Sequence, residues 1–161
     1  MRFLTLVLLI TSLSWGAQAM AETEDKNIEK VLNRLHEAAA EADFEGYFGL
    51  FHPDAVFIGT DASERWDLGA FKAYTKPHFA AGKGWTYKPK TRHIQVAGKV
   101  AWFDEILDSA SYGVCRDTGV LLKEGQQWQI VQYHLTIPIP NALADQVVSL
   151  IKKDSSLPSK K

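Results

Sequence analysis

The most regular pattern in the chain is an alternation of side chains along residues 100–108. One side of this stretch carries Val100, Trp102, Asp104, Ile106 and Asp108, and the other carries Ala101, Phe103, Glu105 and Leu107. A period of two with aromatic and branched side chains predicts a β-strand. Because neither side is wholly polar, we expect both faces to be covered and the strand to be central in its sheet.

Three further stretches have the same strand character, and they lie at residues 85–96, 113–123 and 128–139. Glycine or small polar residues separate the four strands, which is typical of hairpin connections. Four hairpin-linked strands predict an antiparallel meander. A shorter strand is predicted earlier in the chain, at residues 55–59, and a possible second one lies within residues 60–66.

The first third of the domain has a helical pattern instead. Apolar residues recur at steps of three and four over residues 28–42, which predicts an amphipathic helix. Asp43 can cap a short second helix over residues 44–51, and Asp67 can cap a third that ends or kinks at Pro77. These helices followed by a meander predict an α+β domain. We expect the helices to pack on the concave side of a strongly curved antiparallel sheet, forming a cone with a pocket at its open end.

The two ends of the chain differ from the domain. Residues 1–21 combine Arg2, an apolar run and small residues at alternate positions near Ala19, which predicts a cleaved signal peptide and a periplasmic or secreted protein. The apolar run is too short to span a membrane. We expect the domain to cover residues 22–152, ending in a terminal helix, and residues 153–161 to form a disordered tail.

Composition narrows the classes of partner. The 161 residues carry a formal charge of -1, without a basic cluster in the domain, so no nucleic-acid partner is expected. Cys115 is the single cysteine, which excludes an intrachain disulfide, and we expect it to be a small buried residue. The chain has no metal-ligand spacing and no glycine-rich phosphate loop, so no cofactor is predicted.

Three stretches resemble the SnoaL-like branch of the nuclear transport factor 2-like (NTF2-like) superfamily, which has a cystatin-like α+β fold. They are residues 51–61, residues 101–105, and residues 125–134 with their Trp128 and His134. The resemblance extends over residues 28–151, and the ending at residues 133–141 is similar to secreted members. It implies the cone-shaped fold. The superfamily includes isomerases, dehydratases, cyclases and non-enzymatic adaptors, so the resemblance leaves the activity open.

Hairpin register predicts which side chains meet. Folding the strands at the predicted turns lines up Arg92, Asp104, Arg116 and His134 across four neighbouring strands. Trp102 lies on the face of Asp104, and apolar surface around convergent charges is typical of a ligand pocket. Asp104 and His134 are therefore the predicted proton carriers of an acid–base site, with Arg116 positioning charge. Ordinary cross-strand charge pairing is the competing interpretation.

Further ligand-binding residues are predicted at the mouth of the cone. Asp61, Arg65 and Trp66 lie in the loop where the cone should open, and His78 follows the third helix. Turn chemistry alone is the competing interpretation for Asp61 and Arg65, and it is the stronger one. By contrast, we expect Glu105 to be solvated or at an interface, and His36 to lie on a helix surface.

Three functions are consistent with these patterns. The first is a domain that binds a small, partly apolar molecule in the pocket. The second is a cofactor-free acid–base enzyme of the isomerase, dehydratase or cyclase type. The third is a dimerisation or protein-interaction module whose pocket is filled by its own side chains. A homodimer is expected in any case, because the convex face predicted to hold Phe103, Leu107, Val131 and Tyr133 is too apolar to remain in water.

Overall fold

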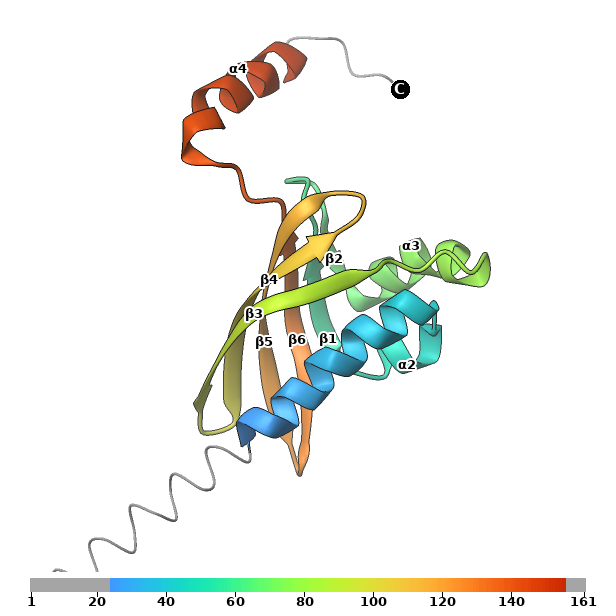
Figure 1. Cartoon of the computed structure of the whole chain (residues 1–161). Coiled ribbons are helices and arrows are strands. Elements are labelled where there is room, and N and C mark those ends of the chain that lie inside the picture. Colours follow the sequence, from blue (N-terminus) through green and yellow to red (C-terminus); the bar gives the residue numbers. More distant parts are fainter. Residues whose placement is uncertain (1–23, 156–161) are drawn as a thin grey trace, which may run out of the picture.

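The computed structural model describes residues 24–155, and these form a curved six-stranded sheet with helices on one face (Figure 1). The N-terminal helix covers residues 24–41. The remaining elements are α2 (Phe44–Phe48), β1 (Phe51–Ile58), β2 (Arg65–Asp67), α3 (Leu68–Ala80), β3 (Tyr87–Ala97), β4 (Val100–Ser109), β5 (Gly113–Glu124), β6 (Gln127–Thr136), the 3-10 turn η1 (Asn141–Leu143) and α4 (Ala144–Ser155). The predicted α+β class is confirmed.

The sheet has the strand order β2-β1-β6-β5-β4-β3. Strands β3 to β6 form the predicted antiparallel meander, and β1 joins it by pairing in parallel with β6. Gly98 and Gly125 stand in two-residue hairpin turns with φ of 64° and 60°. Glycine adopts this conformation without the steric cost that a side chain would bring.

The predicted helix caps are confirmed. The Asp43 carboxylate accepts a hydrogen bond from the Gly46 N–H at the start of α2, and the Asp67 carboxylate accepts one from the Ala70 N–H at the start of α3. Helix α3 continues through Pro77 to Ala80, so of the two predicted alternatives, an end or a kink at the proline, the end is wrong. Only the last turn follows Pro77.

An aromatic core fills the space between the helices and the inner face of the sheet. Tyr47 of α2 packs against Phe51, Phe71 and Phe79 with ring centroids 5.3–6.0 Å apart. Phe48 packs against Phe51 and Phe71 at 5.9 and 5.3 Å. The N-terminal helix adds a buried apolar stripe of Ile28, Leu32, Leu35, Ala38 and Ala39. Burial of this surface is the main force that holds the helices on the sheet.

The two faces of β4 are the reverse of the prediction. Phe103, Glu105 and Leu107 are buried against the helices, whereas Trp102 is 43% exposed and Asp104 lies on the outer face with it. The predicted convex patch fails for the same reason, since Phe103, Leu107 and Tyr133 are all buried inside. A buried glutamate was not expected, and alternation alone does not say which face is the inner one when both faces are mixed.

The register of the hairpins differs from the prediction by one or two residues. Arg92 pairs with Glu105 instead of Asp104, and Arg116 pairs with Ile106 and Thr136 instead of His134. The difference arises because the β3–β4 turn contains two residues and the β4–β5 turn three, and because a bulge shifts the β5–β6 ladder between Val120 and Leu121. A shift of one residue moves a side chain to the other face of the sheet.

The long edge strand of the sheet is β3. Its pairing with β4 shifts between Pro89 and Thr91, which marks an irregularity beside the proline. Lys90, at the shift, forms an ion pair with Asp108 over 2.6 Å. At the opposite edge, β2 is only three residues long.

The C-terminal helix is longer than predicted, because α4 continues to Ser155. Residues 156–161 of the predicted tail and the predicted signal peptide at residues 1–21 lie outside the described residues. Within residues 24–155, no helix combines the length and apolar character needed to cross a membrane.

Candidate functional site

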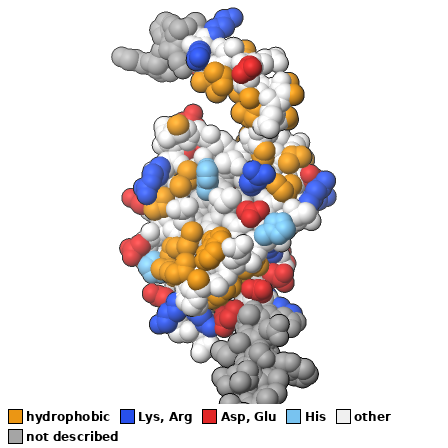
Figure 2. Space-filling model, turned by 90° about the vertical axis from the view of Figure 1, so that its left-hand side faces the viewer, with side chains coloured by type: hydrophobic (Ala, Val, Ile, Leu, Met, Phe, Trp, Pro, Cys, Tyr) orange, Lys and Arg blue, Asp and Glu red, His pale blue; other side chains and the backbone are white. Residues whose placement is uncertain are grey.

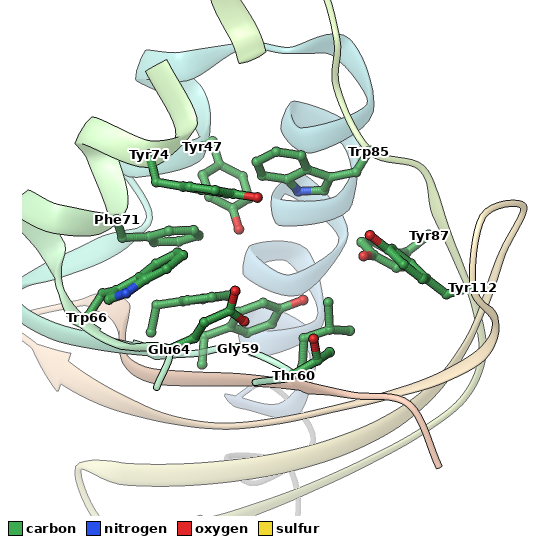
Figure 3. Close-up of a pocket in the computed structure, with 13 residues that line it drawn as sticks. Tyr47, Gly59, Thr60, Glu64, Trp66, Phe71, Tyr74, Trp85, Tyr87 and Tyr112 are labelled. Carbon is green, nitrogen blue, oxygen red and sulfur yellow. The ribbon is translucent and has the colours of Figure 1, made fainter. Parts of the chain in front are cut away.

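A cavity of about 180 Å³ opens between α3, the loop after β1 and the C-terminal end of β6 (Figure 3). Its walls are mainly aromatic, and its lining residues are Tyr47, Phe57, Gly59, Thr60, Glu64, Trp66, Phe71, Tyr74, Trp85, Tyr87, Tyr112, Tyr133 and Leu135. These side chains come from both helices and strands, so the cavity forms where the helical layer meets the open end of the cone.

One wall of the cavity is a set of stacked rings. Phe57 of β1 stacks on Phe71 of α3 with centroids 4.0 Å apart and planes 12° apart. Trp66 stacks on Phe57 at 5.7 Å and approaches Tyr74 at 4.8 Å. Because each ring is held by another, the wall is a preformed flat surface, which favours a ligand that is itself flat.

Polar groups enter the cavity at a few points. Figure 3 shows the Glu64 carboxylate and the hydroxyls of Tyr47 and Tyr74 directed into the same space. Glu64 is held by the Asp61 N–H, which donates to Glu64 Oε2 over 3.2 Å. A Cβ atom at Gly59 would lie 2.0 Å from that oxygen, so the glycine makes room for the carboxylate.

Asp117 of β5 lies directly behind the cavity lining. The hydroxyl of Tyr133, a lining residue, donates a hydrogen bond to Asp117 Oδ2. Asp117 is fully buried, and its Oδ1 atom has no hydrogen-bond partner. Burial raises the pKa of Asp117 to about 8. The hydrogen bond from Tyr133 and the charge of Arg92 lower this pKa, and the charge of Glu105 raises it further. The carboxyl is therefore largely neutral at pH 7.

A buried ion network lies farther inside the cone. Glu105 has both oxygens bonded, to His36 Nε2 over 2.6 Å and to Arg92 Nε over 2.7 Å. Arg92 also donates to Asn33 Oδ1 over 2.8 Å. Glu105 is fully buried and His36 is nearly so, hence the expectations of a solvated glutamate and a surface histidine are wrong. The network ties the N-terminal helix to β3 and β4.

His36, Glu105 and Asp117 present donor atoms within 4.8 Å of one another, a donor set that suits a divalent cation. However, the Arg92 guanidinium already neutralises Glu105, and Asp117 is neutral through its raised pKa. A divalent cation would have to displace a proton beside a fixed positive charge. We therefore assign this cluster to charge compensation.

Of the ligand-binding residues predicted from the sequence, Trp66 lines the cavity. Asp61, Arg65 and His78 are exposed outside it, and Asp61 binds the N–H and hydroxyl of Ser63, the turn chemistry that was the competing interpretation. His78 contacts the ring of Tyr74 at 5.2 Å. Arg92 points inward as predicted but belongs to the ion network.

The other predicted residues lie on the wrong face for this cavity. Asp104, Thr118 and His134 are consecutive partners across β4, β5 and β6, so Asp104 and His134 share the outer face with a strand between them. Trp102 and Arg116 are exposed. Their predicted catalytic role required Asp104 and His134 to be paired inside a hollow. Their position on the outer face of the sheet contradicts that requirement.

The polar residues that sequence reasoning missed are Glu64, Asp117 and Tyr133, with His36 and Glu105 behind them. One signal for Asp117 was available. Cys115 was predicted to be buried and is buried, and Asp117 stands two residues later on the same face of one strand. No comparable signal marks Glu64, because a loop has no fixed side-chain period.

Several solved structures are similar to this chain. An NTF2-like protein of unknown function from Pseudomonas putida KT2440 has a TM-score of 0.64 at 18% identity, covering 74% of this chain and 90% of that one. A candidate dehydratase of the NTF2-like family from Streptomyces avermitilis gives 0.64 at 14% identity, covering 74% and 99%. A candidate ketosteroid isomerase from Shewanella frigidimarina gives 0.55 at 18% identity, covering 66% and 92%. Such identities establish the fold alone.

No curated protein matches the sequence. Residues 28–140 match the SnoaL-like domain family, a range that includes the N-terminal helix from residue 28, α2, α3 and the whole sheet. The chain therefore belongs to the SnoaL-like domain family and has the NTF2-like fold.

Proposed function

We propose that the protein binds a small, partly apolar molecule with a flat ring in the aromatic cavity. The observation that carries the proposal is the combination of stacked rings on one wall with the Tyr133–Asp117 pair on another. A cavity of about 150 Å³ lined by apolar side chains is known to accept a benzene ring. The cavity here is of similar size and adds hydroxyl groups, which supports a single-ring or two-ring ligand bearing an oxygen atom.

The binding prediction can be tested with 2-naphthol as a probe. We expect 2-naphthol to quench tryptophan fluorescence and to raise the unfolding temperature, since a ligand at about 100 times its Kd adds about 2.7 kcal/mol to the free energy of unfolding. Trp66→Leu should weaken binding by about tenfold or more, because it removes part of the flat wall.

Trp102→Leu is the matched control, because the same substitution then falls on the outer face. It should leave the affinity for 2-naphthol unchanged. Equal losses of affinity in the two variants, or no binding by the wild type at millimolar probe, would exclude the cavity as a site for this class of ligand.

A second proposal is a cofactor-free acid–base enzyme, and the raised pKa of Asp117 favours it specifically. Neutral Asp117 carries a proton that it can donate to the Tyr133 oxygen, which reverses the direction of their hydrogen bond. The Tyr133 O–H is then free to donate a hydrogen bond to a carbonyl oxygen in the cavity. Glu64 lines the same cavity and is the carboxylate placed to take a proton. In this case a Glu64→Gln variant that still binds 2-naphthol would lose turnover of the true substrate, whereas a pure binding domain has no turnover to lose.

We further propose that residues 1–21 are a cleaved signal peptide and that the domain works in the periplasm or outside the cell. The apolar run and the small residues near Ala19 support this. Sequencing the N-terminus of protein recovered from the periplasmic fraction should give Met20 or Glu22 as the first residue. Intact Met1 in that material would contradict the proposal.

We also propose a homodimer through the outer face of the sheet. Val100 and Trp102 are 37% and 43% exposed there. Val120 and Leu122 are their direct partners on β5 and are half-buried. Figure 2 shows an apolar patch on this side of the molecule. Contiguous apolar surface of this kind is typical of an interface.

A further inference from the structure

We propose that α4 of one copy packs on the outer sheet face of a second copy, and that the two copies exchange these helices reciprocally. This inference rests on the homodimer proposed above and adds the element that would cover the sheet. Four observations carry it: the composition of α4, the patch on the sheet, the proline-containing linker between them, and the side of the molecule on which both lie.

Helix α4 has an apolar stripe that its own chain leaves in water. Leu143, the last residue of η1, is followed at helical steps by Val147 and Leu150 of α4. Leu143 and Leu150 are 47% and 58% exposed. From Asn141 to Asp154, every residue is exposed except half-buried Val147. A helix of 12 residues is marginal by itself in water, so α4 needs a surface to pack on.

The outer sheet face offers a surface of matching character. Trp102 pairs with Val120, and Val100 pairs with Leu122, so the four side chains form one continuous patch across β4 and β5. On the polar side of α4, Asp145, Ser149 and Lys152 would remain in water when the apolar stripe is covered. Both partners of the proposed contact are thus parts of this chain that lack cover.

The linker keeps α4 away from its own sheet. Strand β6 ends at Thr136, and Pro138 and Pro140 occur within the four residues that follow before η1. Each proline fixes φ and restricts the residue before it to extended conformations. Pro140 has φ of -57° and ψ of 136°, which is extended. Figure 1 accordingly shows α4 projecting beyond the end of the sheet instead of folding back.

The relative placement of the two surfaces fits two-fold symmetry. Figure 2 shows apolar side chains of the C-terminal region and the apolar sheet patch on the same side of the molecule, one above the other. A two-fold axis can run parallel to this surface, midway between α4 and the sheet patch. Rotation about it places a second copy face to face with the first. The same rotation places each α4 on the sheet patch of the other copy, so one operation covers all four apolar surfaces.

The test uses full-length mature protein and light scattering over a range of concentrations. The wild type should be a dimer. Leu150→Glu on α4 and Trp102→Glu on the sheet should each raise the dimer Kd by about tenfold or more, because each places a charge in the apolar contact. Ser149→Glu puts the same charge on the polar side of α4 and should leave the dimer Kd unchanged.

Mixing the two variants distinguishes exchange from other contacts. A mixed dimer of the Leu150→Glu and Trp102→Glu chains retains one helix–sheet contact with two wild-type partners, whereas each variant homodimer has a defect in both contacts. We therefore expect dimers to reappear on mixing at concentrations where each variant alone is monomeric. If mixing the variants restores no dimers, the helix exchange is overturned. A Leu150→Glu protein that dimerises as tightly as the wild type would overturn it too. Neither outcome argues against the homodimer itself. A monomeric wild type would overturn the homodimer as well.

Discussion

Glu105→Gln is expected to lower the free energy of unfolding by about 3–5 kcal/mol, the usual cost of removing one partner from a buried ion pair. Glu105 is fully buried and is the counter-charge of Arg92, whose Nη2 atom already lacks a hydrogen-bond partner. The glutamine would leave the guanidinium without its counter-charge, although only 12% of the Arg92 side chain is exposed to water. Urea unfolding, followed by circular dichroism, measures the loss.

Asp104→Asn is the matched control, because it makes the same chemical change one residue earlier on the outer face. It should change the free energy of unfolding by no more than about 0.5 kcal/mol. Replacing both charges, with Glu105→Leu and Arg92→Met together, should recover part of the loss, since no unpaired charge then remains buried. Similar effects of Glu105→Gln and Asp104→Asn would mean that the faces of β4 are assigned incorrectly.

Asp117 is expected to make the fold less stable as pH rises through the neutral range. The unfolded chain carries an ordinary aspartate near the value of 3.8, whereas burial raises the pKa in the folded state to about 8. Between these values the folded protein holds a proton that the unfolded protein has released, so increasing pH favours unfolding. This destabilisation is absent below the unfolded-state pKa of 3.8 and reaches its full size above the folded-state pKa of about 8. Each unit of difference between the two pKa values contributes about 1.4 kcal/mol to the free energy of unfolding.

The prediction is tested by comparing the wild type with Asp117→Asn from about pH 5 to about pH 9. Asparagine cannot ionise, so the stability of the variant relative to the wild type should increase steadily across this interval, by several kcal/mol in total. Groups that titrate in both proteins cancel in the difference. A difference that stays constant with pH would show that Asp117 keeps an ordinary pKa.

Much of the fold was predictable because it depends on local signals. The caps at Asp43 and Asp67, the turn glycines and the alternation of the four long strands each act within a few residues. They predicted the helices and the meander, and the resemblance predicted the family. The parallel pairing of β1 with β6 was not predicted, because it joins segments far apart in the sequence.

The site was less predictable because it depends on which face of each strand is inside. Trp102 made one face of β4 look like the core, yet Glu105 on the other face is paired with Arg92 and hydrogen-bonded to His36. His36 comes from the N-terminal helix, and no pattern within β4 contains that information. An error of one residue in the register was then enough to select Asp104 in place of Glu105 and to miss Asp117.

The irregular edge strand has a consequence for how copies of this protein meet. An open strand edge can template the addition of strands from other chains and so begin fibril growth. Here Pro89 interrupts the hydrogen-bonding potential of β3, Lys88 and Lys90 bring positive charge to it, and β2 is too short to extend the sheet at the opposite side. Amyloid-like stacking along the hydrogen-bond direction is therefore disfavoured at both ends of the sheet.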